Sequence, residues 1–234
     1  MISSCTTFDA CEAILKASLQ DKEMPMLVAW ARGWRYAFRE ECTPRLHVIT
    51  SAEGLERARR TPLARLRNVT LRENGFPASI LSRGSVLVDI QWHLLWADNF
   101  TSAPFILFYD IDAVPVLPLR CSHLFDEHER ALFFAFDYVA NGGGPTRWVR
   151  PDSAATSVPL RLANLDFMTT WPILAPRKVL PHVRRLVLAA HSNHSSCFDE
   201  AWATMGDHGS HADLIAKTAL MTFPARSDLA LTSP

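Results

Sequence analysis

The sequence predicts an α/β domain built on a mostly parallel β-sheet with helices on its faces. Short apolar runs at residues 46–50, 105–109 and 131–137 alternate with segments of helical spacing, which is the pattern of βαβ units. These runs are apolar at nearly every position, as expected of strands buried on both faces. The run at 105–109 ends in Asp110 and Asp112, and ligands of open α/β sheets bind just beyond the carboxyl ends of the strands.

The first half of the chain alternates predicted helices and strands. Apolar residues recur at helical spacing from residue 27 onward, and Ser51 stands where a hydroxyl would cap the following helix. The expected elements, in order, are a helix at 8–20, a helix at 27–38, a strand at 46–50, a helix at 52–60, a weak strand at 69–71 and a helix at 86–100.

The second half begins with the acid-tipped strand at 105–109. The segment at 113–119 carries two prolines, which suits an extended edge rather than a central strand. The three glycines after Asn141 mark a surface loop. The remaining expected elements are a strand at 131–137, a flexible loop at 141–157, a strand and turn at 166–172, and helices at about 176–190, 197–205 and 210–220.

The composition is that of a globular protein with a sizeable core. The 234 residues are 48% hydrophobic, and 24 basic side chains balance 24 acidic ones, so the formal net charge is zero. A neutral chain lacks the basic surface on which nucleic-acid binding depends, so we expect no nucleic-acid partner. The 5 cysteines are widely spaced and form no CxxC pair, which argues against a zinc site or a disulfide scaffold.

Targeting and domain organisation also follow from the sequence. No apolar stretch approaches the ~20 residues that cross a bilayer, and residues 1–6 lack the basic and apolar regions of a signal peptide. We therefore expect a soluble protein without a transmembrane segment, cytoplasmic by default. We predict one domain over 1–234, with an N-terminal helical segment at 1–44 and a core at 45–224.

The acidic pair fits two chemistries. In one, Asp110 and Asp112 hold Mn²⁺ or Mg²⁺, since paired hard oxygens suit these cations, and the ion offsets charge on a departing nucleoside diphosphate. In the other, Asp110 is the nucleophile of a haloacid-dehalogenase-like phosphatase, and Lys178, Asp207 and Asp213 are its partners. That fold usually begins with its nucleophile strand, whereas here Asp110 lies near the middle of the chain.

The surroundings of the pair resemble those of GT-A-type, DxD-containing nucleotide-sugar glycosyltransferases. A helix precedes the strand at 105–109, and an extended proline–leucine segment at 113–119 and a Leu-Phe turn at 124–125 follow it. Further similar segments are 168–173, 198–201 and 209–215. The resemblance covers residues 45–224. It implies a GT-A-like, Rossmann-type sheet and metal-dependent transfer of a sugar from a nucleotide-sugar donor to a glycan, protein or small-molecule acceptor.

The resemblance also implies residue roles. Asp112 would be the main metal ligand, and Asp110 would contact the ribose, or the metal through water. Other implied roles are nucleotide binding by Thr50 and Ser51, donor binding by Gln91 and Asp98, and metal or acceptor contacts by His208 and His211. An inverting transfer also needs a general base near the acceptor, for which Asp166 and Asp213 are the candidates. Two alternatives stay open: structural roles for Thr50, Gln91 and Asp98, and a non-catalytic GT-like module that binds nucleotide or glycan.

Overall fold

The computed structural model describes residues 11–16, 21–38, 43–73, 86–137, 139–140, 155–156, 160–168, 170–193, 195–205 and 209–231. The strands in this part of the chain are β1 (Cys11–Lys16), β2 (Arg45–Thr50), β3 (Val69–Glu73), β4 (Phe105–Tyr109), β5 (Ala131–Asp137), β6 (Leu165–Asp166), β7 (Ile173–Pro176) and β8 (Ser227–Leu231). The α-helices are α1 (Met24–Ala37), α2 (Ala52–Arg59), α4 (Val86–Leu95), α6 (Leu160–Ala163), α7 (Val179–Ala190), α8 (Phe198–Met205) and α9 (His211–Thr222). Short 3₁₀ turns are η2 (Asp21–Glu23), η4 (Pro62–Arg65), η5 (Ala97–Asn99), η6 (Cys121–His123) and η8 (Pro224–Arg226).

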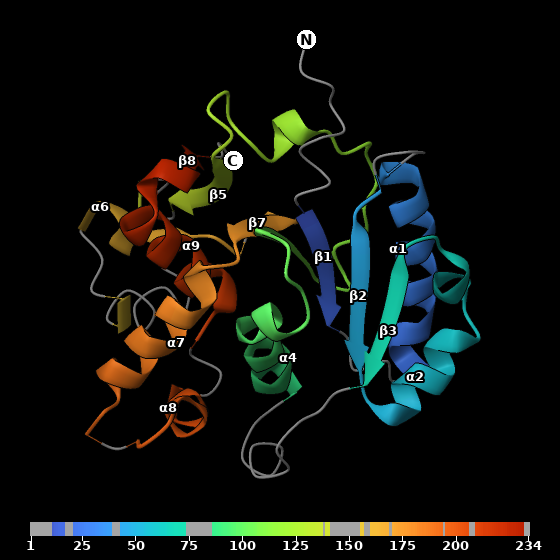
Figure 1. The fold of residues 1–234 in the computed structure, drawn as a ribbon, viewed down its shortest axis with the longest axis horizontal. Coiled ribbons are helices and arrows are strands. Elements are labelled where there is room, and N and C mark those ends of the chain that lie inside the picture. The colour runs from blue at the N-terminus through green and yellow to red at the C-terminus, as the bar shows by residue number, and fades with distance from the viewer. Residues whose placement is uncertain are drawn as a thin grey trace.

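The larger sheet has the strand order β3-β2-β1-β4-β7 within the described residues. Strand β1 pairs in parallel with β2 and β4, β2 pairs in parallel with β3, and β7 is antiparallel to β4. Helices α1 and α2 lie on one side of this sheet and α4 on the other (Figure 1). The mostly parallel sheet flanked by helices confirms the predicted fold class.

The central strand β1 is the main departure from the sequence prediction. We predicted a helix at 8–20 within a helical segment at 1–44, but Cys11–Lys16 is a strand between β2 and β4. The apolar side chains at 13–15 are fully buried there. An apolar run this short fits either a helix or a strand, and only pairing with two strands far along the chain decides between them.

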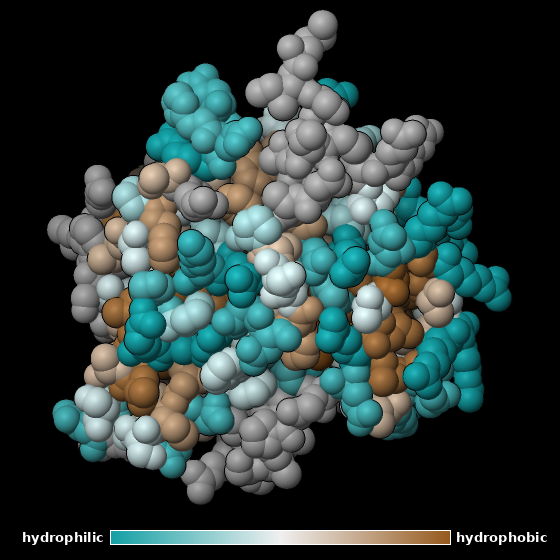
Figure 2. Space-filling view, in the orientation of Figure 1, coloured by the Kyte–Doolittle hydropathy of each residue, from teal (hydrophilic) through white to brown (hydrophobic). Residues whose placement is uncertain are grey.

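The other predicted elements of the first half are confirmed. The apolar face of α1 packs into the core, and the Ser51 hydroxyl caps α2 by accepting a hydrogen bond from the Gly54 N–H at 3.1 Å. The predicted helix at 86–100 is α4 followed by the turn η5. Edge strand β3 is half-buried along most of its length, and Figure 2 shows a hydrophobic area over it.

The extended segment at 113–119 leaves the end of β4 and crosses α1. It forms no strand, and the Leu119 N–H donates to the Ala37 carbonyl at 3.1 Å. A Cβ at Gly33 would lie 2.3 Å from the Pro115 carbonyl oxygen, so only glycine permits this approach. The segment thus lies against a helix rather than along a sheet edge.

The second half confirms three predicted helices as α7, α8 and α9 and adds a smaller sheet of order β6-β5-β8. Strand β8 was not predicted. Of the described residues in the predicted strand and turn at 166–172, only Asp166 lies in a strand, at the end of β6, and β7 begins at Ile173. Most of the predicted loop at 141–157 lies outside the described residues, apart from a helical turn at 155–156. Among the helices that the structure describes, none is long and apolar enough to cross a bilayer.

Candidate functional site

The strand order creates a crevice at the carboxyl ends of β1 and β4. From β1 the chain passes to β2 and β3 on one side, and then returns through α4 to β4 on the other side. Ligands of open α/β sheets bind at such a topological switch point, where neighbouring strands send their connections in opposite directions. The crevice is therefore the candidate site.

The acidic pair lies at the end of β4 in this crevice. Asp110 is half-buried and Asp112 is exposed. The Asp110 carboxylate accepts a hydrogen bond from the Ile111 N–H at 2.7 Å, and the Ala113 N–H donates to the Asp110 backbone carbonyl at 3.2 Å in the turn that follows. Burial and the charge of Asp112 raise the pKa of Asp110 to about 6. A bound cation would relieve this repulsion.

The chemistry of the pair fits a divalent cation. Mg²⁺ in nucleotide sites is commonly held by one or two carboxylates together with substrate phosphates. The described residues contain no group of three or more His, Cys, Asp or Glu that could hold a metal. An ion held by Asp110 and Asp112 would keep further coordination positions for other oxygen atoms.

Strand β1 brings a buried polar cluster to the same crevice, which the sequence analysis missed. Lys16 Nζ lies 3.3 Å from Asp89 Oδ2, and His93 Nδ1 donates to the Asp89 backbone carbonyl at 2.9 Å. Burial lowers the pKa of Lys16, although Asp89 opposes the shift. Burial alone would raise the pKa of Asp89, but His93 and Lys16 outweigh it and lower the pKa. A sequence signal could have found Lys16. It follows the apolar run at 13–15, just as Asp110 follows the apolar run at 105–109.

Thr50 and Ser51 lie at the carboxyl end of β2, on the same edge of the sheet as Asp110. Thr50 is fully buried, and its hydroxyl has no hydrogen-bond partner among the described residues. The Ser51 hydroxyl is engaged as the cap of α2. The structure thus brings Thr50 and Ser51 to the predicted edge, and their contacts with a nucleotide stay a prediction.

Gln91 and Asp98 both have partners within the protein. The Gln91 side-chain oxygen accepts a hydrogen bond from the His211 N–H at 2.9 Å, which links α4 to the start of α9. Asp98 forms a bidentate pair with Arg184 at 2.7 and 2.8 Å, and it precedes β4 rather than following it. The predicted donor contacts of Gln91 and Asp98 both stay predictions.

His211 lies beside β4. Its ring centroid is 6.3 Å from that of Phe108 and 5.7 Å from that of Trp171. Burial lowers the pKa of His211 to about 3, so the imidazole is neutral near pH 7, the form that binds metals. Neither ring nitrogen has a hydrogen-bond partner among the described residues. His208 lies outside the described residues.

Asp166 and Asp213 are buried between the smaller sheet and α9. Asp213 accepts hydrogen bonds from the Phe167 N–H at 2.6 Å and from Lys217 Nζ at 3.1 Å. Asp166 accepts one from the Met168 N–H at 2.8 Å. Burial raises the pKa of Asp213 to about 6, with Lys217 opposing the shift and Asp166 adding to it. A general base must reach the acceptor hydroxyl, and the catalytic roles of Asp166 and Asp213 stay predictions.

Comparison with known proteins shows similarity of fold to solved structures. No family model and no curated protein matches the chain. Glucosyl-3-phosphoglycerate synthase of M. tuberculosis has a TM-score of 0.50 and 16% identity over 98% of this chain and 74% of that one. The same enzyme in complex with UDP has a TM-score of 0.50 and 15% identity over the same shares of the two chains. The fold of this chain is GT-A-like. A nucleotidyl transferase from Methanothermobacter has a TM-score of 0.44 at 14% identity, covering 96% of this chain and 88% of that one.

The GT-A-like fold separates the residues that a phosphatase would need. The Arg177 N–H donates to the Pro104 carbonyl at 2.8 Å, and β7 is antiparallel to β4. Lys178 therefore lies at the amino end of β4, on the opposite edge of the sheet from Asp110. Asp213 is paired with Lys217, and Asp207 lies outside the described residues. The predicted phosphatase partners are not assembled around Asp110.

A pocket of about 420 Å³ adjoins the carboxyl end of β4 in this GT-A-like fold. The segment at 113–119 forms one wall, and Tyr109, Trp171 and Pro172 form another. The lining of the pocket is mostly apolar. It includes Ala113, the residue directly after Asp112. It offers space for a second molecule beside the acidic pair.

Proposed function

We propose that this protein is a glycosyltransferase that binds a nucleotide sugar in the crevice at the carboxyl ends of β1 and β4. The observation that carries the proposal is the position of Asp110 and Asp112, since they follow one of the two strands that form the switch point. The likeness of the fold to an enzyme solved with UDP supports it.

Asp110 and Asp112 would hold Mn²⁺ or Mg²⁺ against the diphosphate of the donor. The bound cation supplies Lewis-acid stabilisation of the leaving diphosphate. Asp112 is exposed and free to ligate directly, whereas Asp110 is held by the Ile111 N–H and orients the turn. A metal contact of His211 stays a prediction, because the described residues do not group it with Asp110 and Asp112.

The buried residues around the crevice would position the donor. The ion pair between Lys16 and Asp89 joins the end of β1 to α4. It would hold these two elements in place beside the crevice. Thr50 and Ser51 would lie near the nucleoside. Rigid placement of such groups lowers the barrier by orienting the reactants.

The pocket beside β4 would receive the acceptor. Its wall at 113–119 exposes Val116 and Leu117 to solvent. Large exposed apolar side chains beside a polar site are typical of ligand pockets. An acceptor with an apolar portion next to its reacting hydroxyl fits this wall best.

A thermal-shift panel of UDP-, GDP- and CMP-sugars, with and without Mn²⁺, tests the proposal. We expect at least one donor to raise the melting temperature only with Mn²⁺, and the Asp110→Asn/Asp112→Asn variant to lose that shift. Glu127→Gln removes an exposed carboxylate from the turn before β5 and is the matched control. Absence of a metal-dependent shift with every donor would refute the proposal.

Product analysis separates the alternatives. Donor consumption with Mn²⁺ supports a transferase, whereas a metal-dependent shift without consumption supports a binding module. Rapid hydrolysis of a generic phosphate ester that is lost in Asp110→Asn would instead indicate the phosphatase.

A further inference from the structure

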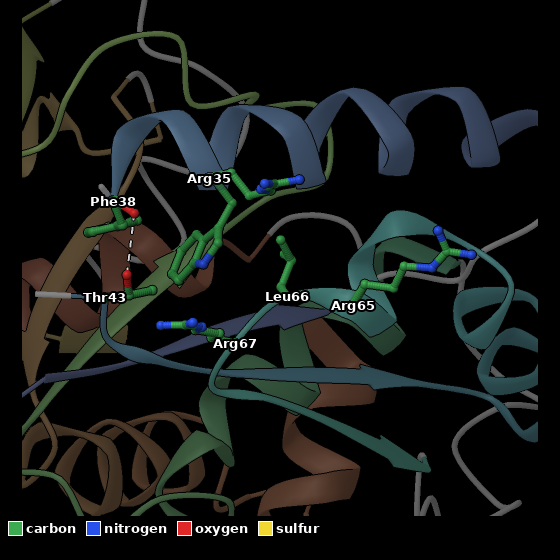
Figure 3. Close-up of a pocket in the computed structure, with 7 residues that line it drawn as sticks. Arg35, Phe38, Thr43, Arg65, Leu66 and Arg67 are labelled. Atoms are coloured by element: carbon green, nitrogen blue, oxygen red, sulfur yellow. Dashed lines mark hydrogen bonds between the residues drawn. The ribbon is translucent and has the colours of Figure 1, made fainter. Parts of the chain in front are cut away.

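A second pocket, of about 430 Å³, lies between the end of α1 and the turn η4 (Figure 3). Its apolar lining comes from Trp34, Phe38 and Leu66, and its charged lining from Arg35, Arg65 and Arg67. The volume falls within the roughly 300–1,000 Å³ typical of small-molecule sites.

The described lining of the pocket is basic. None of its described lining residues is acidic, and the three arginines are exposed. They make no ion pair or hydrogen bond with any residue that the structure describes, whereas Arg57 and Arg59 on the nearby α2 each pair with a glutamate. Figure 3 shows Arg67 extending toward Thr43, and Arg35 and Arg65 pointing the other way.

Trp34 supplies a second, independent feature. Its side chain is 1% exposed, and its indole N–H has no hydrogen-bond partner among the described residues. Leaving a buried donor unsatisfied is unfavourable. Trp34 also lines the pocket, so this unsatisfied donor belongs to the wall of the site.

We infer that this pocket binds a small phosphorylated molecule. Its phosphate would be held by the arginines that line the pocket, whose planar guanidinium donors match phosphate oxygens in pairs. The rest of the ligand packs in the pocket against Trp34, Phe38 and Leu66. These apolar contacts favour binding of a phosphate ester over free phosphate.

The pocket is separate from the crevice that holds the acidic pair. Thr43 and Arg67 each lie two residues before a strand, β2 and β3 respectively, so the pocket opens at the amino ends of these strands. Asp110 follows the carboxyl end of β4. A ligand held here is therefore not the donor bound at Asp110, and the inference does not depend on the proposed function.

Titration followed by tryptophan fluorescence and calorimetry tests the inference, with phenyl phosphate, inorganic phosphate and phenol as ligands in buffer containing EDTA. We expect saturable binding of phenyl phosphate, weaker binding of inorganic phosphate and no binding of phenol. Arg35→Gln/Arg67→Gln should weaken binding of phenyl phosphate at least about tenfold, since each lost contact is a charged hydrogen bond.

Two controls make the result specific. Arg32→Gln removes the same charge from an exposed position on α1 outside the pocket and should leave binding unchanged. Asp110→Asn/Asp112→Asn should also bind phenyl phosphate normally. The inference is overturned if neither phosphate ligand saturates, if phenol binds as well as phenyl phosphate, or if Arg32→Gln weakens binding as much as the double variant.

Discussion

Asp110 and Asp112 differ in how much water surrounds each carboxylate. Asp110 is half-buried and carries a pKa raised to about 6, so its charged form is disfavoured in the folded protein at pH 7. In Asp110→Asn this unfavourable charge disappears, while a side-chain oxygen remains for the Ile111 N–H. The charged carboxylate of Asp110 therefore lowers the free energy of unfolding at this pH.

We therefore expect Asp110→Asn to be more stable than the parent in EDTA at about pH 7, by roughly 1–3 kcal/mol, and to gain nothing from Mn²⁺. Urea unfolding with and without Mn²⁺ measures both effects. A less stable Asp110→Asn in EDTA would show that the carboxylate is already balanced by a positive charge.

His211 makes the stability depend on pH in the opposite direction from a paired histidine. Its folded pKa of about 3 lies below the ordinary 6.5, so the unfolded chain binds more protons between these values. Stability is therefore lost as pH falls from 6.5 toward 3. Between about pH 7 and pH 4.5 this amounts to at most about 3 kcal/mol.

The variant His211→Phe keeps a ring against Phe108 and Trp171 but cannot titrate. We expect its free energy of unfolding to differ less between the two pH values than that of the parent, as measured by urea unfolding. His128→Phe, at an exposed histidine, should behave like the parent. Equal acid sensitivity of His211→Phe and the parent would contradict the burial of a neutral imidazole.

At the scale of elements, the Asp98–Arg184 pair ties η5 to α7. Both side chains are 11% exposed, and Arg184 also donates to the Leu95 carbonyl at 2.6 Å and lies 3.9 Å from the centroid of the Trp96 ring. Arg184→Ala leaves a nearly buried carboxylate unpaired, so we expect a loss of about 3–5 kcal/mol. Asp98→Asn/Arg184→Ala should recover part of it in a double-mutant cycle. Additive losses would show that the pair is not coupled.

The crossing of α1 by the segment at 113–119 depends on Gly33. Alanine usually stabilises a helix interior by about 1 kcal/mol relative to glycine, but here its Cβ would meet the Pro115 carbonyl oxygen. We expect Gly33→Ala to lower stability by about 1–3 kcal/mol instead. Arg32→Ala, at the neighbouring exposed position, should not lower stability. The melting temperatures of the two variants test this prediction.

Elements were predictable where the pattern was local. The Ser51 cap and the buried strand at 105–109 have their signals within a few residues, so both were found. The sequence analysis missed β1 because its apolar run becomes a strand only through pairing with β4, far along the chain. The Asp98–Arg184 pair was missed for a similar reason, since Arg184 comes much later in the sequence. The Lys16–Asp89–His93 cluster needed both β1 and α4 in place.

At the scale of the whole molecule, β1 holds the larger sheet together. It lies between β2 and β4, so its removal separates the β2–β3 pair from the β4–β7 pair. We expect a chain that lacks residues 1–16 to lose cooperative unfolding, as followed by circular dichroism during heating. The matched control is a chain that lacks only residues 1–8. A sharp transition after removal of residues 1–16 would show that β1 is dispensable.

The position of β1 also has a consequence for synthesis on the ribosome. Among the strands of the larger sheet, β1 is translated before the others, and β2, β3 and their helices can assemble against one of its edges as soon as they emerge. Its other edge must wait for β4, which pairs Cys11 with Phe105. Until β4 is made, the backbone N–H and C=O groups on this edge of β1 stay unpaired. Unpaired strand edges can pair with other chains. The nascent chain is thus most prone to aggregate while the residues between β3 and β4 are being made.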